Sequence, residues 1–250
     1  MVLHRRTKPT IGTWVQIGDP SLTEMMARSG FDWLTIDLEH TAISIRQCAE
    51  LIRIIDLCGL PAYVRLSGHE STQIKRVLDA GASGVIAPNV TSAAQARTLS
   101  EACRYPPEGT RGAGLARAQG YGQRFDAYRD GAAREVTFIV QIEHIDGVHA
   151  LDAILAVEGV DGFFIGPYDL SGSLGKPGDF SNTEVREALD EVQGFVGSTP
   201  HLAGTHVVDP EHEKLGRALE EGYDFVAFAS DMLFFADNME HVRSSLAHLR

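Results

Sequence analysis

The chain has 250 residues, of which 22 are basic and 34 acidic, so its formal net charge is −12. This length permits one large domain or two small ones, and it is the usual size of a (β/α)8 barrel. The acidic balance argues against nucleic acid and anionic membrane surfaces as partners, because both attract clustered Lys and Arg. With 44% hydrophobic residues, the chain can bury a sizeable core.

Short apolar runs alternate with longer segments of helical spacing along the chain. The runs predict strands over residues 11–17, 33–38, 62–66, 84–87, 137–142, 162–165, 202–207 and 224–229. The longer segments predict helices over residues 21–29, 44–57, 71–80, 93–103, 147–157, 183–197, 211–221 and 238–248. Ser44 and Ser71 are plausible N-caps of two of these helices. Glycines that suit a left-handed helix end precede several strands, at Gly30, Gly81, Gly159 and Gly222.

Eight continuously apolar strands, each followed by a helix, are typical of a parallel sheet covered by helices. We therefore predict a single (β/α)8 TIM barrel over residues 1–250, with a long loop or insert near residues 105–135. A doubly wound open sheet is the alternative. Its G-x-G-x-x-G signature is missing after the first strand, where Gly18-Asp19-Pro20 follows instead.

Three cysteines, Cys48, Cys58 and Cys103, form no C-x-x-C pair. They favour a reducing compartment over a disulfide framework or a structural zinc site. No apolar run of signal-peptide length follows the basic start of the chain, and none reaches the roughly 18 residues of a membrane span. We therefore expect a cytoplasmic protein that binds neither membranes nor nucleic acid.

Polar side chains gather where the predicted strands end, which is the end that carries the active site in (β/α)8 barrels. In strand order, the residues at these ends are Gln16, Asp37, Glu39, His40, Arg65, Asn89, Gln141, Glu143, His144, Gly166, Pro167, Tyr168, Asp169, Thr205, His206 and Asp231. A barrel without a ligand has no need of so many polar groups at one end. We therefore expect a site for a small molecule there.

Glu143 and Asp169 follow neighbouring strands, so both carboxylates can lie in the mouth of the barrel, which is its opening at the carboxyl ends of the strands. Two carboxylates without a Cys or a pair of His suit a hard cation such as Mg²⁺ or Mn²⁺. The alternative is that each carboxylate caps a helix or pairs with an Arg.

His40 follows two acidic residues, and such a partner can orient an imidazole as a general base. A structural histidine is the alternative. Arg65 ends an otherwise apolar strand, where a guanidinium either forms a buried ion pair or binds a carboxylate or enolate oxygen.

The positions of the four lysines argue against imine chemistry. A Schiff-base aldolase needs a lysine amine in the mouth, but none of Lys8, Lys75, Lys176 and Lys214 follows a strand directly. The loops after the last two strands also lack the glycines of a phosphate site, which weakens a phosphate-binding isomerase.

These strand ends resemble those of the metal-dependent pyruvate aldolases of the 4-hydroxy-2-oxoheptanedioate aldolase (HpcH/HpaI) family. The resemblance covers nearly the whole chain. Its most specific blocks are Asp37-Leu38-Glu39-His40, Val64-Arg65, residues 105–112 (YPPEGTRG), Gln141-Ile142-Glu143 and residues 166–171 (GPYDLS).

The resemblance implies a role for each candidate residue. Glu143 and Asp169 are expected to bind a divalent metal (Mg²⁺, Mn²⁺ or Co²⁺), and His40 to act as base with Asp79 as its dyad partner. Arg65 is expected to bind the keto or enolate oxygen, with Asp37 and Glu39 in support. Residues expected to line the substrate site are Gln141, Gly166, Pro167, Tyr168 and Thr205. Tyr168 stands where we expect a small residue or Asn, so it is expected to reshape the acceptor pocket.

The implied reaction is the reversible cleavage of a 4-hydroxy-2-oxo acid to an aldehyde and pyruvate, or a related 2-oxo acid such as hydroxypyruvate. The implied assembly is a homohexamer, a trimer of dimers that exchange the last helix. Alternatives that use the same site are an acyl-CoA lyase and an oxaloacetate decarboxylase. A non-catalytic binding barrel is disfavoured by the intact His, Arg and carboxylate set.

Overall fold

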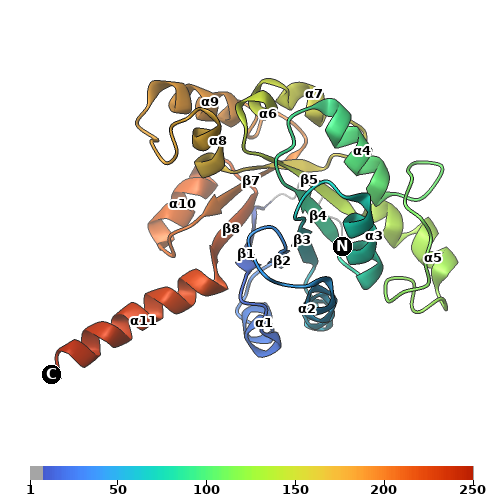
Figure 1. The fold of residues 1–250 in the computed structure, drawn as a ribbon, viewed down its shortest axis with the longest axis horizontal. Coiled ribbons are helices and arrows are strands. Elements are labelled where there is room, and N and C mark those ends of the chain that lie inside the picture. The colour runs from blue at the N-terminus through green and yellow to red at the C-terminus, as the bar shows by residue number, and fades with distance from the viewer. Residues whose placement is uncertain (1–7, 250) are drawn as a thin grey trace.

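The computed structural model describes residues 8–249, and within them eight parallel strands close into a barrel (Figure 1). The strands are β1 (Thr10–Val15), β2 (Trp33–Asp37), β3 (Ala62–Arg65), β4 (Gly84–Ala87), β5 (Thr137–Ile142), β6 (Gly162–Ile165), β7 (Leu202–Val207) and β8 (Phe225–Ser230). Each strand pairs with the next along the chain, and β8 pairs with β1. The predicted (β/α)8 barrel is confirmed.

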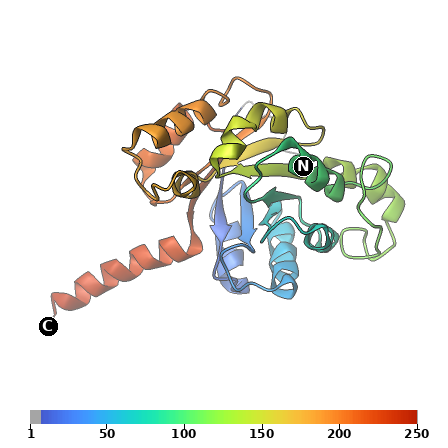
Figure 2. The same ribbon diagram turned by 45° about the horizontal axis from the view of Figure 1, so that its top comes forward.

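Helices follow the strands and surround the barrel (Figure 2). They are α1 (Pro20–Ala27), α2 (Ile45–Leu57), α3 (Ser71–Ala80), α4 (Ala93–Cys103), α5 (Phe125–Asp130), the 3₁₀ helix η1 (Ala132–Glu135), α6 (Ile145–His149), α7 (Leu151–Leu155), α8 (Pro167–Ser173), α9 (Thr183–Gln193), α10 (His212–Glu220) and α11 (Asp231–Ala247). The segment predicted as a long insert holds α5 and η1. No described helix is long and apolar enough to cross a membrane.

Local side-chain and backbone contacts explain where the helices begin and end, and one predicted N-cap is wrong. Ser44 caps α2 through a reciprocal capping box with Gln47. Ser71 was predicted as a cap but is the first helical residue of α3, whose N-cap Glu70 makes no side-chain cap bond. At the other end of α3, Gly81 has φ of 104°, a left-handed conformation that suits glycine.

Two apolar layers hold the barrel together. One lies between the sheet and its helices. The other fills the barrel interior and consists of Trp14, Trp33, Tyr63, Ile86, Ile139, Phe164, Leu202, Phe225 and Ala227. Trp33 stacks on Phe225 with ring centroids 4.1 Å apart, and this stack is possible because Gly12 leaves room beside the indole. The interior is therefore a packed floor of rings beneath the strand ends.

The last helix does not pack along the barrel. Both views show α11 projecting away from the other helices (Figures 1 and 2). Its partly exposed apolar residues repeat at heptad spacing, as Met232, Phe235, Met239, Val242 and Leu246. The described chain therefore leaves one apolar helix face without a partner.

Candidate active site

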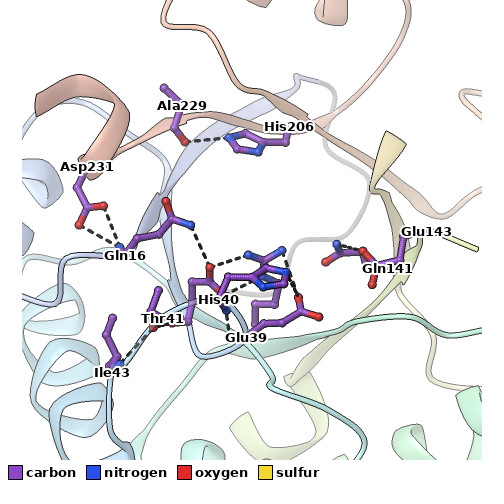
Figure 3. A network of polar contacts seen from close by, with 12 residues as sticks. Gln16, Glu39, His40, Thr41, Ile43, Gln141, Glu143, His206, Ala229 and Asp231 are labelled. Atoms are coloured by element: carbon purple, nitrogen blue, oxygen red, sulfur yellow. Dashed lines mark hydrogen bonds and ion pairs between the residues drawn. The ribbon is translucent and has the colours of Figure 1, made fainter. Parts of the chain in front are cut away.

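A buried ion pair lies at the polar end of the barrel, within the network of polar contacts that Figure 3 draws around Gln16, Glu39 and His40. Asp37 ends β2, is fully buried, and receives Arg65 from β3 through Nε at 2.9 Å and Nη2 at 2.6 Å. Gln16 Nε2 donates to the same carboxylate at 3.0 Å. Burial alone would raise the pKa of Asp37, but Arg65 and Gln16 outweigh it and hold that pKa below its usual range.

Arg65 is held in a fixed orientation by three neighbours. Its bidentate contact with Asp37 uses one edge of the guanidinium, and the plane lies 4.5 Å from the ring centroid of Trp14. Nη1 lies 3.3 Å from Glu39 Oε2. Because Asp37 engages only two of the five N–H donors, Nη donors are left for a substrate oxygen.

Glu39 and His40 continue from β2 around the mouth. His40 is exposed, and its Nε2 lies 3.6 Å from Glu39 Oε2. That oxygen is buried and accepts no hydrogen bond. Burial raises the pKa of Glu39, although the positive charge of Arg65 opposes the shift. Within one chain, Glu39 is therefore the carboxylate beside His40.

The opposite wall of the mouth carries Glu143, which follows β5. Its Oε1 accepts the Asn89 backbone N–H at 2.6 Å, and its Oε2 accepts Gln141 Nε2 at 2.5 Å. Burial, joined by the negative charges of Glu39 and Asp169, raises the pKa of Glu143 to about 7. Three carboxylates are thus near enough here to repel one another, and a bound cation would relieve that repulsion.

The residues fit a hard divalent cation. Gln141 Oε1 is buried without a hydrogen-bond partner, and a Cβ on Gly166 would lie 2.9 Å from Glu143 Oε2, so glycine keeps this space open. Among residues 8–249 no group of three His, Cys, Asp or Glu side chains is arranged to hold a metal. Glu143 and Asp169 would therefore rely on water or substrate oxygens to complete the coordination, as Mg²⁺ commonly does.

A short helix that was not predicted presents Asp169. The predicted helices leave out residues 166–171, but Pro167 occupies the first position of α8, where its fixed φ suits a helix. Asp169 lies in the first turn, near enough to influence both Glu39 and Glu143. Tyr168 is 62% exposed, and its ring lies against Gly178 in the following loop.

Two predicted site residues are not brought to the mouth. Asp79 lies in the last turn of α3, which runs back from the mouth, and its Oδ1 accepts Arg111 Nη2 at 2.7 Å. The predicted pair of His40 and Asp79 is therefore not formed within one chain. Thr205 shares the outward face of β7 with Ala203 and Val207, which pack in the layer under the helices.

His206 was named among the strand ends but given no role in the site, and it is the residue of β7 that points into the barrel there. Its ring lies 5.8 Å from that of Trp14, and its Nε2 contacts Ala229 O at 3.1 Å. Trp14 and the backbone of Asn89 were missed as well. The signal available for His206 and Trp14 was the two-residue period of their strands, which places both on the face that points into the barrel.

Protonation of His206 should make the fold acid-sensitive. Burial lowers its pKa from 6.5 to about 4, so the unfolded chain takes up a proton at a higher pH than the folded chain. Stability should fall by about 3 kcal/mol as pH drops from roughly 6.5 to 4. Urea unfolding over this range should show a weaker pH dependence in His206→Gln, whose amide can still donate to Ala229. Parallel pH curves for the two proteins would contradict this.

The fold and the site together define a barrel enzyme with an arginine and paired carboxylates at its mouth. Residues 10–237 match the family model described as HpcH/HpaI aldolase/citrate lyase. A hydroxypyruvate/pyruvate aldolase of Roseovarius nubinhibens is 38% identical over 242 residues, which cover 96% of this chain and 92% of the relative. A 2-keto-3-deoxy-L-rhamnonate aldolase of Klebsiella pneumoniae is 37% identical, covering 94% and 88%.

The fold of a solved relative agrees with this. The crystal structure of an HpcH/HpaI aldolase/citrate lyase family protein from Burkholderia cenocepacia superposes with a TM-score of 0.91 at 32% identity, covering 98% of this chain and 97% of that one. The chain belongs to the HpcH/HpaI aldolase/citrate lyase family and is an enzyme of its aldolase class.

Proposed function

We propose that this enzyme is a divalent-metal-dependent aldolase that reversibly cleaves 4-hydroxy-2-oxo acids to an aldehyde and pyruvate, or a related 2-oxo acid such as hydroxypyruvate. One observation carries the proposal: Arg65, held rigidly by Asp37, stands in the same mouth as the carboxylates of Glu143 and Asp169. This places a fixed positive charge and a cation site on either side of a bound 2-oxo group. The names of the relatives support the same chemistry.

Glu143 and Asp169 hold the metal in this proposal, and Gln141 lines its site. When bound, a divalent cation supplies Lewis-acid polarisation of the 2-oxo group and offsets the charge of the surrounding carboxylates. Mg²⁺, Mn²⁺ and Co²⁺ all accept such ligands to some degree. Gly166, Pro167 and Tyr168 border the pocket, and Tyr168 shapes its acceptor side.

The protein's own residues then account for the proton and charge movements. His40 removes the proton from the 4-hydroxyl group, the C3–C4 bond breaks, and the aldehyde forms at C4. The electron pair passes to the enolate of the 2-oxo acid, whose oxygen accepts hydrogen bonds from the Nη atoms of Arg65. His40 returns its proton to C3, which completes the reaction and regenerates the base, while the carboxylate of Glu39, 3.6 Å from Nε2, favours the protonated imidazole in between.

Enolate formation can be measured without knowing the aldehyde. After chelation, the enzyme should exchange the methyl protons of pyruvate for deuterium only when Mg²⁺, Mn²⁺ or Co²⁺ is restored, because the metal is needed to acidify them. Proton NMR follows the loss of the methyl signal. Absence of exchange with every metal would overturn the proposed function, and exchange in excess chelator would remove the metal from it. Borohydride with pyruvate should label no lysine.

We also propose a homo-oligomer, a hexamer built from dimers that exchange α11. The supporting feature is the heptad stripe of α11 defined above, which a second copy can cover. Phe235→Glu should reduce the assembly size in sedimentation velocity, because it places a charge in the stripe. Ser244→Glu puts the same charge on the opposite face and should leave the size unchanged. Equal sizes for the wild type and Phe235→Glu would contradict the exchange.

Two expectations remain predictions beside this proposal. One is a single domain over residues 1–250. The other is a cytoplasmic location, supported by three cysteines that are all free in the described chain.

A further inference from the structure

A buried carboxylate joins the start of α11 to the end of β1. Asp231 is 3% exposed, and all three of its hydrogen-bonded neighbours are backbone N–H groups. Gln16 N donates to Oδ1 at 2.9 Å and to Oδ2 at 3.0 Å, and Ile17 N donates to Oδ2 at 2.9 Å. Met232 N donates to Oδ1 at 2.8 Å. We call this arrangement the Asp231 clip.

The clip lies where the pairing between β1 and β8 ends. The register of β1 with β8 shifts between Gly12 and Trp14, and the pairing ends at Trp14 and Ser230. Beyond that point Asp231 accepts the N–H groups of Gln16 and Ile17, the two residues that directly follow β1. Just before it, Ala229 has a left-handed φ of 50°, which an alanine adopts at a cost. The chain is thus bent to place this carboxylate at the seam.

Capping of α11 does not explain Asp231. The N-cap of α11 is Ser230, whose side chain accepts from Leu233 N. Two of the three N–H groups that Asp231 holds belong to Gln16 and Ile17, which directly follow β1, and not to the helix. The geometry is therefore that of a crosslink between two elements.

The residue that the clip holds also contacts the site. Gln16 is fixed through its backbone N–H by Asp231, and its side-chain Nε2 donates to Asp37 Oδ2. The same oxygen accepts Arg65 Nη2. Figure 3 shows this chain of contacts from Asp231 through Gln16 toward the residues of β2. Three consecutive hydrogen-bonded steps therefore connect α11 to the guanidinium of Arg65.

We infer that Asp231 and Gln16 are positioning residues. They fix the Asp37–Arg65 pair at the position where Arg65 meets the 2-oxo group, because they link this pair to the first turn of α11. The inference rests on the proposed function for its catalytic readout, because Arg65 acts there on the enolate oxygen. Neither residue touches substrate in this role. Their effect passes through Asp37.

A double-mutant cycle of Asp231→Asn and Gln16→Leu tests this, with Mn²⁺ present at saturation. Each substitution should lower kcat for deuterium exchange of pyruvate by between about tenfold and a hundredfold, the size expected of small misplacements of a catalytic group. The double variant should be no slower than the slower single variant, because both act through one contact. Mn²⁺ affinity, measured by electron paramagnetic resonance of the free ion, should be unchanged, since Glu143 and Asp169 lie on the other wall.

Asp161→Asn is the matched control. Asp161 Oδ2 accepts the Phe138 N–H at 2.7 Å, so it is also a carboxylate that holds a strand, but at the opposite end of the barrel. It should lower thermal stability without lowering kcat. Wild-type kcat in either single variant, additive losses in the double variant, or an equal loss of kcat in Asp161→Asn would each overturn the inference.

Tryptophan fluorescence gives a readout that does not depend on activity. Because Arg65 lies against Trp14, displacement of the guanidinium should shift the emission in Asp231→Asn and Gln16→Leu alike, and not in Asp161→Asn. If the wild type shows no exchange at all, the proposed function fails, and the emission spectra alone decide the inference. Unshifted emission in both variants would then reject it.

Discussion

Arg65→Ala is expected to lose deuterium exchange of pyruvate by about a thousandfold or more. Removing one donor from an oxyanion site alone costs about 10² to 10³ in rate, and here the lost group also fixes the geometry around Asp37. The substitution leaves Asp37 buried without its positive partner. Breaking such a pair costs about 3–5 kcal/mol of stability, so a lower thermal midpoint should accompany the lost rate.

A second variant separates these two effects. Asp37→Leu combined with Arg65→Met removes both charges and leaves apolar groups of similar size, so it should regain much of the stability. It should remain inactive, because no guanidinium faces the enolate oxygen. Arg65→Lys keeps the charge but not the bidentate contact, and should retain only part of the rate. Normal exchange in Arg65→Ala would refute the role of Arg65 outright.

Gly12→Ala is expected to destabilise the barrel interior strongly. A Cβ at this position would lie 2.0 Å from Trp33 Cδ2, and the indole cannot move because it stacks on Phe225 and meets the edge of Tyr63. Overpacking of a core costs about 1–3 kcal/mol and occasionally more. Because the clash is with a rigid ring, we expect about 3 kcal/mol or more, measured as a shift of the urea midpoint.

Gly216→Ala is the control for this change. Gly216 lies within α10, and nothing stands within 4 Å of a Cβ added there. Alanine should stabilise the helix by up to about 1 kcal/mol. If Gly12→Ala and Gly216→Ala unfold at the same urea concentration, the packing of the rings around Gly12 is not tight.

The sequence predicted the sheet better than the helices that carry the chemistry. All eight strands were found because each is a buried apolar run, and burial on both faces leaves a continuous signal. Helix α8 was missed because its seven residues hold one proline, one glycine and two serines, which leaves too few apolar positions to show a period. The start of α11 was placed too late, because Asp237 and Asn238 interrupt a helix that already begins at Asp231.

The sequence predicted which strand ends form the candidate site, but it did not predict which way their side chains point. Asp37, Arg65, Gln141 and Glu143 lie in the mouth, as expected from their positions. Thr205 was chosen over His206 although they are neighbours, and only the strand parity separates them. Asp79 came from the family resemblance, and linear order does not show that α3 carries it away from His40. Contacts such as Gln16 with Asp231 join residues 215 positions apart, beyond the reach of local patterns.

The floor of aromatic rings inside the barrel also determines how molecules enter and leave the site. Trp14, Trp33, Phe164 and Phe225 are each at most 2% exposed, so in the described part of the chain no passage runs through the barrel beneath Arg65. The site is a dead end with a single opening. In the proposed cleavage, the 2-oxo acid and the aldehyde must therefore leave on the same side of the barrel. The route of product release is therefore set by the packing of residues that never touch the substrate.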